Sequence, residues 1–163
     1  MAWILRRLAQ RTMFKHLRGD AMSDRSKILI VDDEEVVRLS HFRLLAKGDR
    51  NVEAVWNGAE ALREMERDAF DLVLLDLRMP GMDGMSVLKT IKEKWPESEV
   101  VVITGDPSVE TATEAIRLGA YDYLVKPVDP FQVIEVADSA IRQKKWTMHK
   151  VRGVEPVHGS ACW

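Results

Sequence analysis

A regular alternation between two hydrophobic patterns is the feature of this sequence that most constrains its fold. Short, nearly continuous apolar runs are typical of strands that are buried on both faces of a sheet. Longer segments whose apolar residues recur every three or four positions are typical of amphipathic helices. The expected strands are 27–31, 52–56, 71–75, 99–104 and 121–125, and the expected helices are 34–46, 59–68, the segment between Asp83 and Pro96, 107–118 and 129–145.

Five strands alternating with five helices predict an α/β fold. When a helix connects two strands of one sheet, the strands are parallel and the helix packs on the sheet. Repetition of this unit gives a five-stranded parallel sheet that is doubly wound, with helices on both faces. In such sheets, ligands bind outside the carboxyl ends of the strands.

The size and composition of the chain fit one compact domain with two tails. Its 163 residues are enough to bury a core without disulfides, and its net charge of −2 gives no general reason to expect a nucleic-acid partner. No apolar run approaches the ~18 residues that a membrane span needs. The single cysteine, Cys162, offers no disulfide within the chain, which fits a reducing, cytoplasmic setting.

The alternating pattern sets the expected domain boundaries. Residues 26–145 form the domain, and residues 146–163 form a C-terminal tail without a second periodic helix. Residues 1–25 are expected to be a disordered leader or a weak basic helix, because arginine and lysine outnumber acidic residues there. Met22 is an alternative start, since the first strand follows it closely.

Chemically useful side chains follow four of the five expected strands. Asp32 and Asp33 come after the first strand, Asp76 after the third, Thr104 ends the fourth, and Lys126 follows the fifth. Each residue alone has an ordinary explanation, such as a helix cap, a strand threonine or a solvated lysine. The joint pattern differs, because parallel strands bring these ends to one edge of the sheet.

The residue types at this edge complement one another. Carboxylates that lie close together repel each other and are stable only beside a cation. Oxygen ligands without histidine or cysteine favour Mg²⁺, and Lys126 supplies a second positive charge. A carboxylate nucleophile surrounded by cations suits phosphoryl transfer, and the hydroxyl of Thr104 can hydrogen-bond the transferred group.

The segments "ILIVDDEE", "LVLLDLRMPGMDG", "VVVITG" and "YDYLVKP" resemble the receiver domain of bacterial two-component response regulators, a CheY-like, flavodoxin-like fold, over residues 26–145. The resemblance implies that Asp76 is the phosphoacceptor and takes a phosphoryl group from a phosphohistidine of a sensor histidine kinase or phosphotransfer protein. It also implies that Asp33, supported by Asp32, binds Mg²⁺ together with Asp76 and the backbone carbonyl of Arg78. Lys126 would pair with the carboxylate and then with the phosphoryl group, and its bond to Pro127 would be cis.

The resemblance further implies a switch that carries the signal to a downstream protein. Thr104 would move toward the phosphoryl group, and Tyr123 would follow it, reshaping the face made by segments 107–118, 121–125 and 129–145. Arg78 and Asp106 would flank the path of the attacking water. We hypothesise that their opposite charges pair across the mouth of the site and slow hydrolysis of the aspartyl phosphate.

Three other classes of protein agree less well with the sequence. A flavin-binding flavodoxin needs a phosphate-cradling loop after its first strand, but here residues 32–35 are all acidic. An aspartate-nucleophile phosphatase of the haloacid dehalogenase type carries a second aspartate where this chain has Arg78. A purely structural module has no need for Lys126 and Asp33 together. A receiver is not an enzyme in the ordinary sense, since it accepts and loses its own phosphoryl group.

The extent of the whole protein stays open between two interpretations. The absence of an output domain after residue 145 resembles stand-alone receivers, which act by docking to another protein and do not bind nucleic acid directly. The alternative is a receiver fragment of a larger response regulator. The sequence does not identify the kinase or the downstream target.

Overall fold

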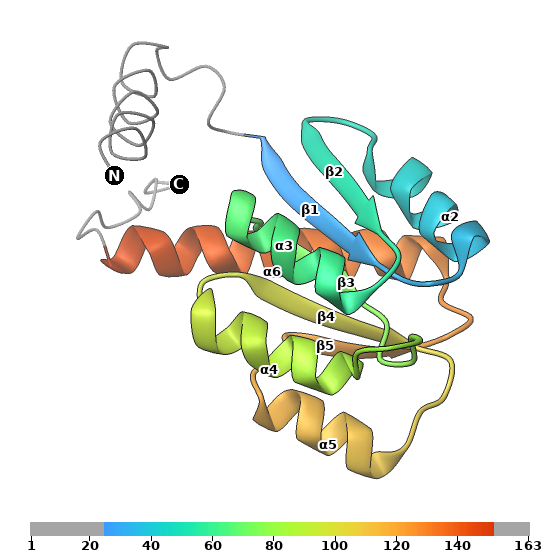
Figure 1. Cartoon of the computed structure of the whole chain (residues 1–163). Helices are drawn as coiled ribbons and strands as arrows, with labels where there is room; N and C mark the ends of the chain where they lie inside the picture. Colours follow the sequence, from blue (N-terminus) through green and yellow to red (C-terminus); the bar gives the residue numbers. More distant parts are fainter. Residues whose placement is uncertain (1–24, 152–163) are drawn as a thin grey trace, which may run out of the picture.

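The computed structural model describes residues 25–151, so the expected leader and residues 152–163 lie outside the described residues. Strands and helices alternate along the described chain (Figure 1). In order they are β1 Ser26–Val31, α2 Glu35–Leu45, β2 Arg50–Val55, α3 Gly58–Arg67, β3 Leu72–Leu75, α4 Gly84–Lys94, β4 Glu99–Thr104, α5 Val109–Arg117, β5 Asp122–Val125 and α6 Pro130–Val151.

All five strands form one parallel sheet with the order β2-β1-β3-β4-β5, which confirms the predicted fold class. The register pairs Val31 at the end of β1 with Leu75 at the end of β3. Asp32 and Asp76 are the next residues of these two neighbouring strands. The register therefore carries both carboxylates to the same point on the carboxyl edge of the sheet.

The helices cover the two faces of the sheet in two groups (Figure 1). Side chains of α2 and α6 pack with Ile28 and Ile30 on one face, whereas side chains of α3, α4 and α5 pack with Leu29 and Val31 on the other. Consecutive residues of β1 thus face opposite layers, as expected for a strand that is buried on both sides. This double burial explains why the strand sequences are apolar throughout.

Helix α5 begins later than the sequence pattern predicts. Pro107 was expected in its first turn, but the helix starts at Val109, so that expectation is wrong. Ser108 is the N-cap: its side chain accepts a hydrogen bond from the Thr111 amide, and the Thr111 side chain bonds the Ser108 backbone in return. This capping box satisfies amide groups that a start at Pro107 would leave open.

Helix α6 extends beyond its predicted end at Lys145 and runs to Val151, so the first residues of the expected tail are helical. Residues 146–151 contain no glycine or proline that would stop the helix. Within residues 25–151, no helix combines the length and apolar character that crossing a bilayer requires.

Candidate functional site

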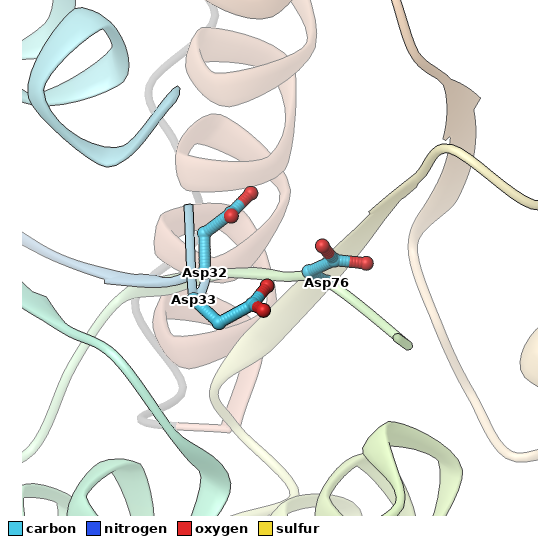
Figure 2. A group of neighbouring side chains, drawn as sticks. All are labelled: Asp32, Asp33 and Asp76. Carbon is cyan, nitrogen blue, oxygen red and sulfur yellow. The ribbon is translucent and has the colours of Figure 1, made fainter. Parts of the chain in front are cut away.

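Three aspartates converge at the carboxyl edge between β1 and β3 (Figure 2). Asp32, Asp33 and Asp76 each offer one carboxylate oxygen, and these oxygens lie within 4.8 Å of one another. Asp32 and Asp76 are only 3% and 4% exposed, whereas Asp33 is exposed. The donors are all hard oxygens with an open side toward solvent, and this donor set fits Mg²⁺.

Asp76 is held by backbone and side-chain contacts from three directions. Its amide donates to the carbonyl oxygen of Val31 at 2.9 Å, which extends the pairing of β3 with β1 by one residue. Its Oδ1 accepts a hydrogen bond from the Arg78 amide at 3.0 Å, and its Oδ2 accepts one from Lys126 Nζ at 2.9 Å. Both carboxylate oxygens of Asp76 therefore have a hydrogen-bond donor that fixes their direction.

Gly84 allows α4 to begin directly against this turn. A Cβ at position 84 would lie 2.7 Å from the carbonyl oxygen of Asp76 and 2.5 Å from the Cα of Leu77. Both distances are too short for a side chain, and both neighbours are rigid backbone. The glycine therefore lets the first turn of α4 support the loop that follows Asp76.

Lys126 provides the positive charge of the site. Its Nζ lies 2.7 Å from Asp32 Oδ2, 2.9 Å from Asp76 Oδ2 and 3.3 Å from Glu34 Oε1. The Lys126 amide donates to the Thr104 carbonyl oxygen at 2.8 Å, and the bond to Pro127 is cis. Glu34 was not singled out from the sequence, although its place in the acidic run after β1 was a signal that could have found it.

Burial and the neighbouring opposite charge shift the pKa values of Asp32 and Lys126 in opposite directions. Burial raises the pKa of Asp32 and the Asp76 charge adds to this, although the hydrogen bond with Lys126 partly offsets both. Burial alone would lower the pKa of Lys126, but its hydrogen bonds to Asp32 and Asp76 outweigh this and raise it. Lys126 therefore stays charged at neutral pH, and one ammonium faces several carboxylates.

Thr104 and Tyr123 lie on the strands that continue the sheet from β3. Thr104 is fully buried at the end of β4, and its Oγ1 accepts a hydrogen bond from the Asp106 amide at 3.3 Å. The Tyr123 hydroxyl lies 2.8 Å from Oγ1 of Thr111, the residue that closes the capping box of α5. Thr111 was not among the expected site residues, although its spacing from Ser108 is a recognisable capping signal.

Arg78 and Asp106 form an ion pair across the loops that follow β3 and β4. Their side chains are 71% and 63% exposed, so the pair lies at the rim of the site and not within it. Expected roles of these residues beyond the pairing, including the backbone carbonyl of Arg78 as a metal ligand, stay predictions.

Comparison with known proteins gives the same family for most of the described chain. Residues 28–138 match the family model of the response regulator receiver domain. The chain is 40% identical over 121 residues to the transcriptional regulatory protein ZraR of Salmonella typhimurium, covering 74% of this chain and 27% of the relative. It is 36% identical over 117 residues to the DNA-binding transcriptional regulator NtrC of Escherichia coli, covering 72% of this chain and 25% of that relative.

Solved structures agree with these relatives. A CheY-like receiver domain protein from Methanospirillum hungatei superposes with a TM-score of 0.74 at 27% identity, covering 76% of this chain and 99% of that one. NtrX from Brucella abortus in complex with ADP superposes with a TM-score of 0.73 at 34% identity, covering 83% of this chain and 31% of NtrX.

The chain spans about a quarter of the length of the two curated relatives named above, at 27% and 25%. The family model nevertheless matches residues 28–138, a range that contains Asp32, Asp76, Thr104 and Lys126. The chain belongs to the response regulator receiver domain family of two-component systems.

Proposed function

We propose that Asp76 accepts a phosphoryl group from a phosphohistidine of a sensor histidine kinase or phosphotransfer protein. A carboxylate oxygen of Asp76 attacks phosphorus, the P–N bond breaks, and the imidazole leaves with the electron pair. The observation that carries this proposal is the geometry of Asp76, which is buried, oriented by the Arg78 amide and paired with Lys126 at 2.9 Å.

Lys126 supports this step by its position between two carboxylates. Its ammonium already contacts the Asp76 oxygen. We expect it to stay beside that oxygen when the phosphoryl group is attached. A fixed cation that needs no reorganisation stabilises the charge on the transferring oxygens. An open hollow between α2 and the loop after β5 is lined in part by His41, Lys126 and Val128. We expect a donor imidazole to approach Lys126 from this side.

Asp32, Asp33 and Asp76 are the residues that would hold Mg²⁺, and Arg78 would add its backbone carbonyl. When bound, the ion neutralises negative charge on the transferring phosphoryl oxygens. The proposal is supported by the all-oxygen donor set and by the excess of carboxylates over ammonium groups at this edge. The chain then acts as its own substrate and autodephosphorylates, so we do not class it as an enzyme.

The signal would leave the site through Thr104 and Tyr123, as the sequence analysis expects. In the labels of Figure 1 the responding face consists of α5, β5 and α6. This proposal is supported by exposed apolar side chains on these helices: Val109 is 79%, Ile116 53% and Phe131 80% exposed. Exposed apolar groups of this size are typical of surfaces that bind another protein. We place this chemistry in the cytoplasm and propose no direct contact with nucleic acid.

The decisive experiment is incubation with Mg²⁺ and a small acyl phosphate, followed by mass spectrometry of the intact protein. We expect a gain of one phosphoryl group, ~80 Da, in the unmodified chain and no gain in Asp76→Asn. Asp49→Asn is the matched control. The Asp49 side chain is 72% exposed in the loop directly before β2, at the amino edge of the sheet. A gain that persists in Asp76→Asn, or no gain in either protein, contradicts the proposal.

Arg78 and Asp106 are proposed to slow hydrolysis of the aspartyl phosphate by pairing across the mouth of the site. Arg78→Ala should shorten the half-life of the phosphorylated protein, and Asp106→Ala should shorten it similarly because each removes the same pair. The double variant should then lose its phosphoryl group no faster than either single variant. An unchanged half-life in Arg78→Ala refutes this role while leaving phosphorylation itself intact.

A second proposal is that this receiver belongs to a longer response regulator. The observation that favours it is the length of the relatives, which are named transcriptional regulators and are about four times longer than the matched segment. Intact mass of the protein isolated from its native source separates the two cases. A mass of 18.6 kDa supports the stand-alone receiver, and a larger mass supports the fragment.

A further inference from the structure

Asp32 and Asp33 present a geometric problem at the carboxyl edge. Consecutive residues of a strand point to opposite faces of the sheet. Yet both residues place a carboxylate oxygen within 4.8 Å of the other and of Asp76 (Figure 2). The backbone must therefore leave the extended conformation here, and it does: β1 ends at Val31, the chain bends at Asp33, and α2 begins at Glu35.

We propose that Arg38 is the positioning residue that holds this bend and so assembles the cation site. Its guanidinium Nη1 donates to the carbonyl oxygen of Asp32 at 2.7 Å and to that of Asp33 at 3.2 Å. These carbonyls belong to the two rigid peptide planes on either side of the Asp33 Cα. Holding both planes sets φ and ψ of Asp33, and these angles set the direction of its Cα–Cβ bond.

Asp33 depends on this restraint more than Asp32 does. The Asp32 carboxylate accepts hydrogen bonds from the Glu34 amide at 2.9 Å and pairs with Lys126 at 2.7 Å. Within residues 25–148, no side chain or amide bonds the Asp33 carboxylate. The backbone therefore aims the Asp33 Cα–Cβ bond toward the site, and Arg38 is the side chain that bonds both carbonyls of that backbone.

Charge and position make opposite predictions for Arg38, which makes the role testable. Arg38 is a cation beside an acidic cluster, so Coulomb repulsion alone predicts that its removal tightens Mg²⁺ binding. If Arg38 positions Asp33, its removal weakens Mg²⁺ binding instead. Loss of a residue that orients a metal ligand typically costs about 10- to 100-fold in metal affinity. This inference rests on the proposed function, because it takes Mg²⁺ as the ion of the site.

The experiment is calorimetric titration of the full chain with Mg²⁺. We expect Arg38→Met to bind Mg²⁺ at least about tenfold more weakly than the unmodified chain. Arg43→Met is the matched control, since Arg43 is an exposed arginine in the last turn of the same helix, and its Mg²⁺ affinity should stay unchanged. Arg38→Lys keeps the charge but loses the planar guanidinium group. Its Mg²⁺ affinity should therefore lie between those of Arg38→Met and Arg43→Met. Urea unfolding without Mg²⁺ shows whether each variant is folded.

Arg38→Met that binds Mg²⁺ as tightly as the unmodified chain, or more tightly, overturns the inference. If Arg38→Met does not fold, Arg38→Lys decides, and unchanged affinity in that variant overturns the inference. Failure of the proposed function gives a different result, because the unmodified chain then binds no Mg²⁺ and gains no phosphoryl group. If the unmodified chain binds Mg²⁺ and gains a phosphoryl group, and the Arg38 variant binds Mg²⁺ equally well, only the role of Arg38 is refuted.

Discussion

The two edges of the sheet each contain a nearly buried lysine, but the charges around these lysines differ. At the amino edge, Lys144 is 10% exposed, lies 3.0 Å from Asp71 and donates to the Phe70 carbonyl oxygen at 3.0 Å. Asp71 also accepts the Lys27 amide at 2.7 Å. At the carboxyl edge, Lys126 is 14% exposed and faces Asp32, Asp76 and Glu34 at once, with Asp33 close by.

This difference separates a balanced ion pair from a site with an excess of negative charge. At the amino edge one ammonium meets one carboxylate, and the pair joins the start of β3 to α6 without a surplus of either sign. At the carboxyl edge negative charge exceeds positive charge, which is unfavourable until a cation binds. Stability should therefore depend on Mg²⁺ at one edge and not at the other.

The largest expected effect follows from Lys126→Met. Removing the ammonium leaves Asp32 and Asp76 buried together without compensation, so the free energy of unfolding should fall by about 3 kcal/mol at neutral pH. Mg²⁺ should then stabilise this variant more than the unmodified chain, because the ion replaces the missing charge. Urea unfolding with and without Mg²⁺ measures both quantities. A loss of stability that Mg²⁺ does not reduce would remove the distinction between the edges.

Lys144→Met should have a smaller effect and a different character. It leaves the half-buried Asp71 without its cation and the Phe70 carbonyl without one donor, so unfolding should become easier by about 2 kcal/mol. Mg²⁺ affinity and phosphorylation from an acyl phosphate should stay as in the unmodified chain. A Mg²⁺ affinity that falls in this variant would show that the two edges are coupled.

The next effect depends on pH and concerns Asp32. Its folded-state pKa is raised above the usual 3.8, mainly by burial, so the folded protein binds this proton more readily than the unfolded chain. That stabilisation is complete below pH 3.8 and is lost as pH rises through the folded-state pKa. Measured without Mg²⁺, the unfolding free energy of the unmodified chain relative to Asp32→Asn should therefore increase on acidification from neutral pH. If the difference in unfolding free energy between the two proteins does not change on acidification, the pKa of Asp32 is not raised in the folded protein.

The smallest expected effect concerns the rim of the carboxyl edge. Arg78 and Asp106 are both more than half exposed, so Arg78→Ala should change the free energy of unfolding by less than about 0.5 kcal/mol. A larger loss in urea unfolding would mean that the pair belongs with the buried charges. This measurement also shows whether a change in phosphoryl lifetime in the same variant is independent of stability.

The sequence predicted the parts of this molecule that depend on regular patterns. Strands buried on both faces have continuous apolar runs, so β1 and β3 were identifiable, and parallel pairing then placed Asp32, Asp76, Thr104 and Lys126 at one edge. Contacts that depend on a single turn or on a long side chain were missed. Arg38 reaches back across one helical turn, and no periodicity marks an arginine that bonds two carbonyls.

The errors at helix ends have similarly local causes. Pro107 fits the first turn of a helix, but the reciprocal bonds of Ser108 and Thr111 place the start one residue after Ser108. The apolar repeat stops near Lys145 and therefore predicts the end of α6 there. The helix continues because its backbone hydrogen bonds need no apolar side chains, and Lys144 pairs with Asp71, directly before β3, near that point.

Helix α6 also has a mechanical consequence, since it runs from the loop after Lys126 to a point beyond the amino edge (Figure 1). Along a helix axis, roughly 21 Å separate Pro130 from Lys144 and roughly 10 Å separate Lys144 from Val151. Lys144 ties the helix to Asp71 and the Phe70 carbonyl, whereas Val133 and Ala137 pack its first part on the sheet. If its first turn tilted about Lys144, its last turn would move in the opposite direction by about half as much.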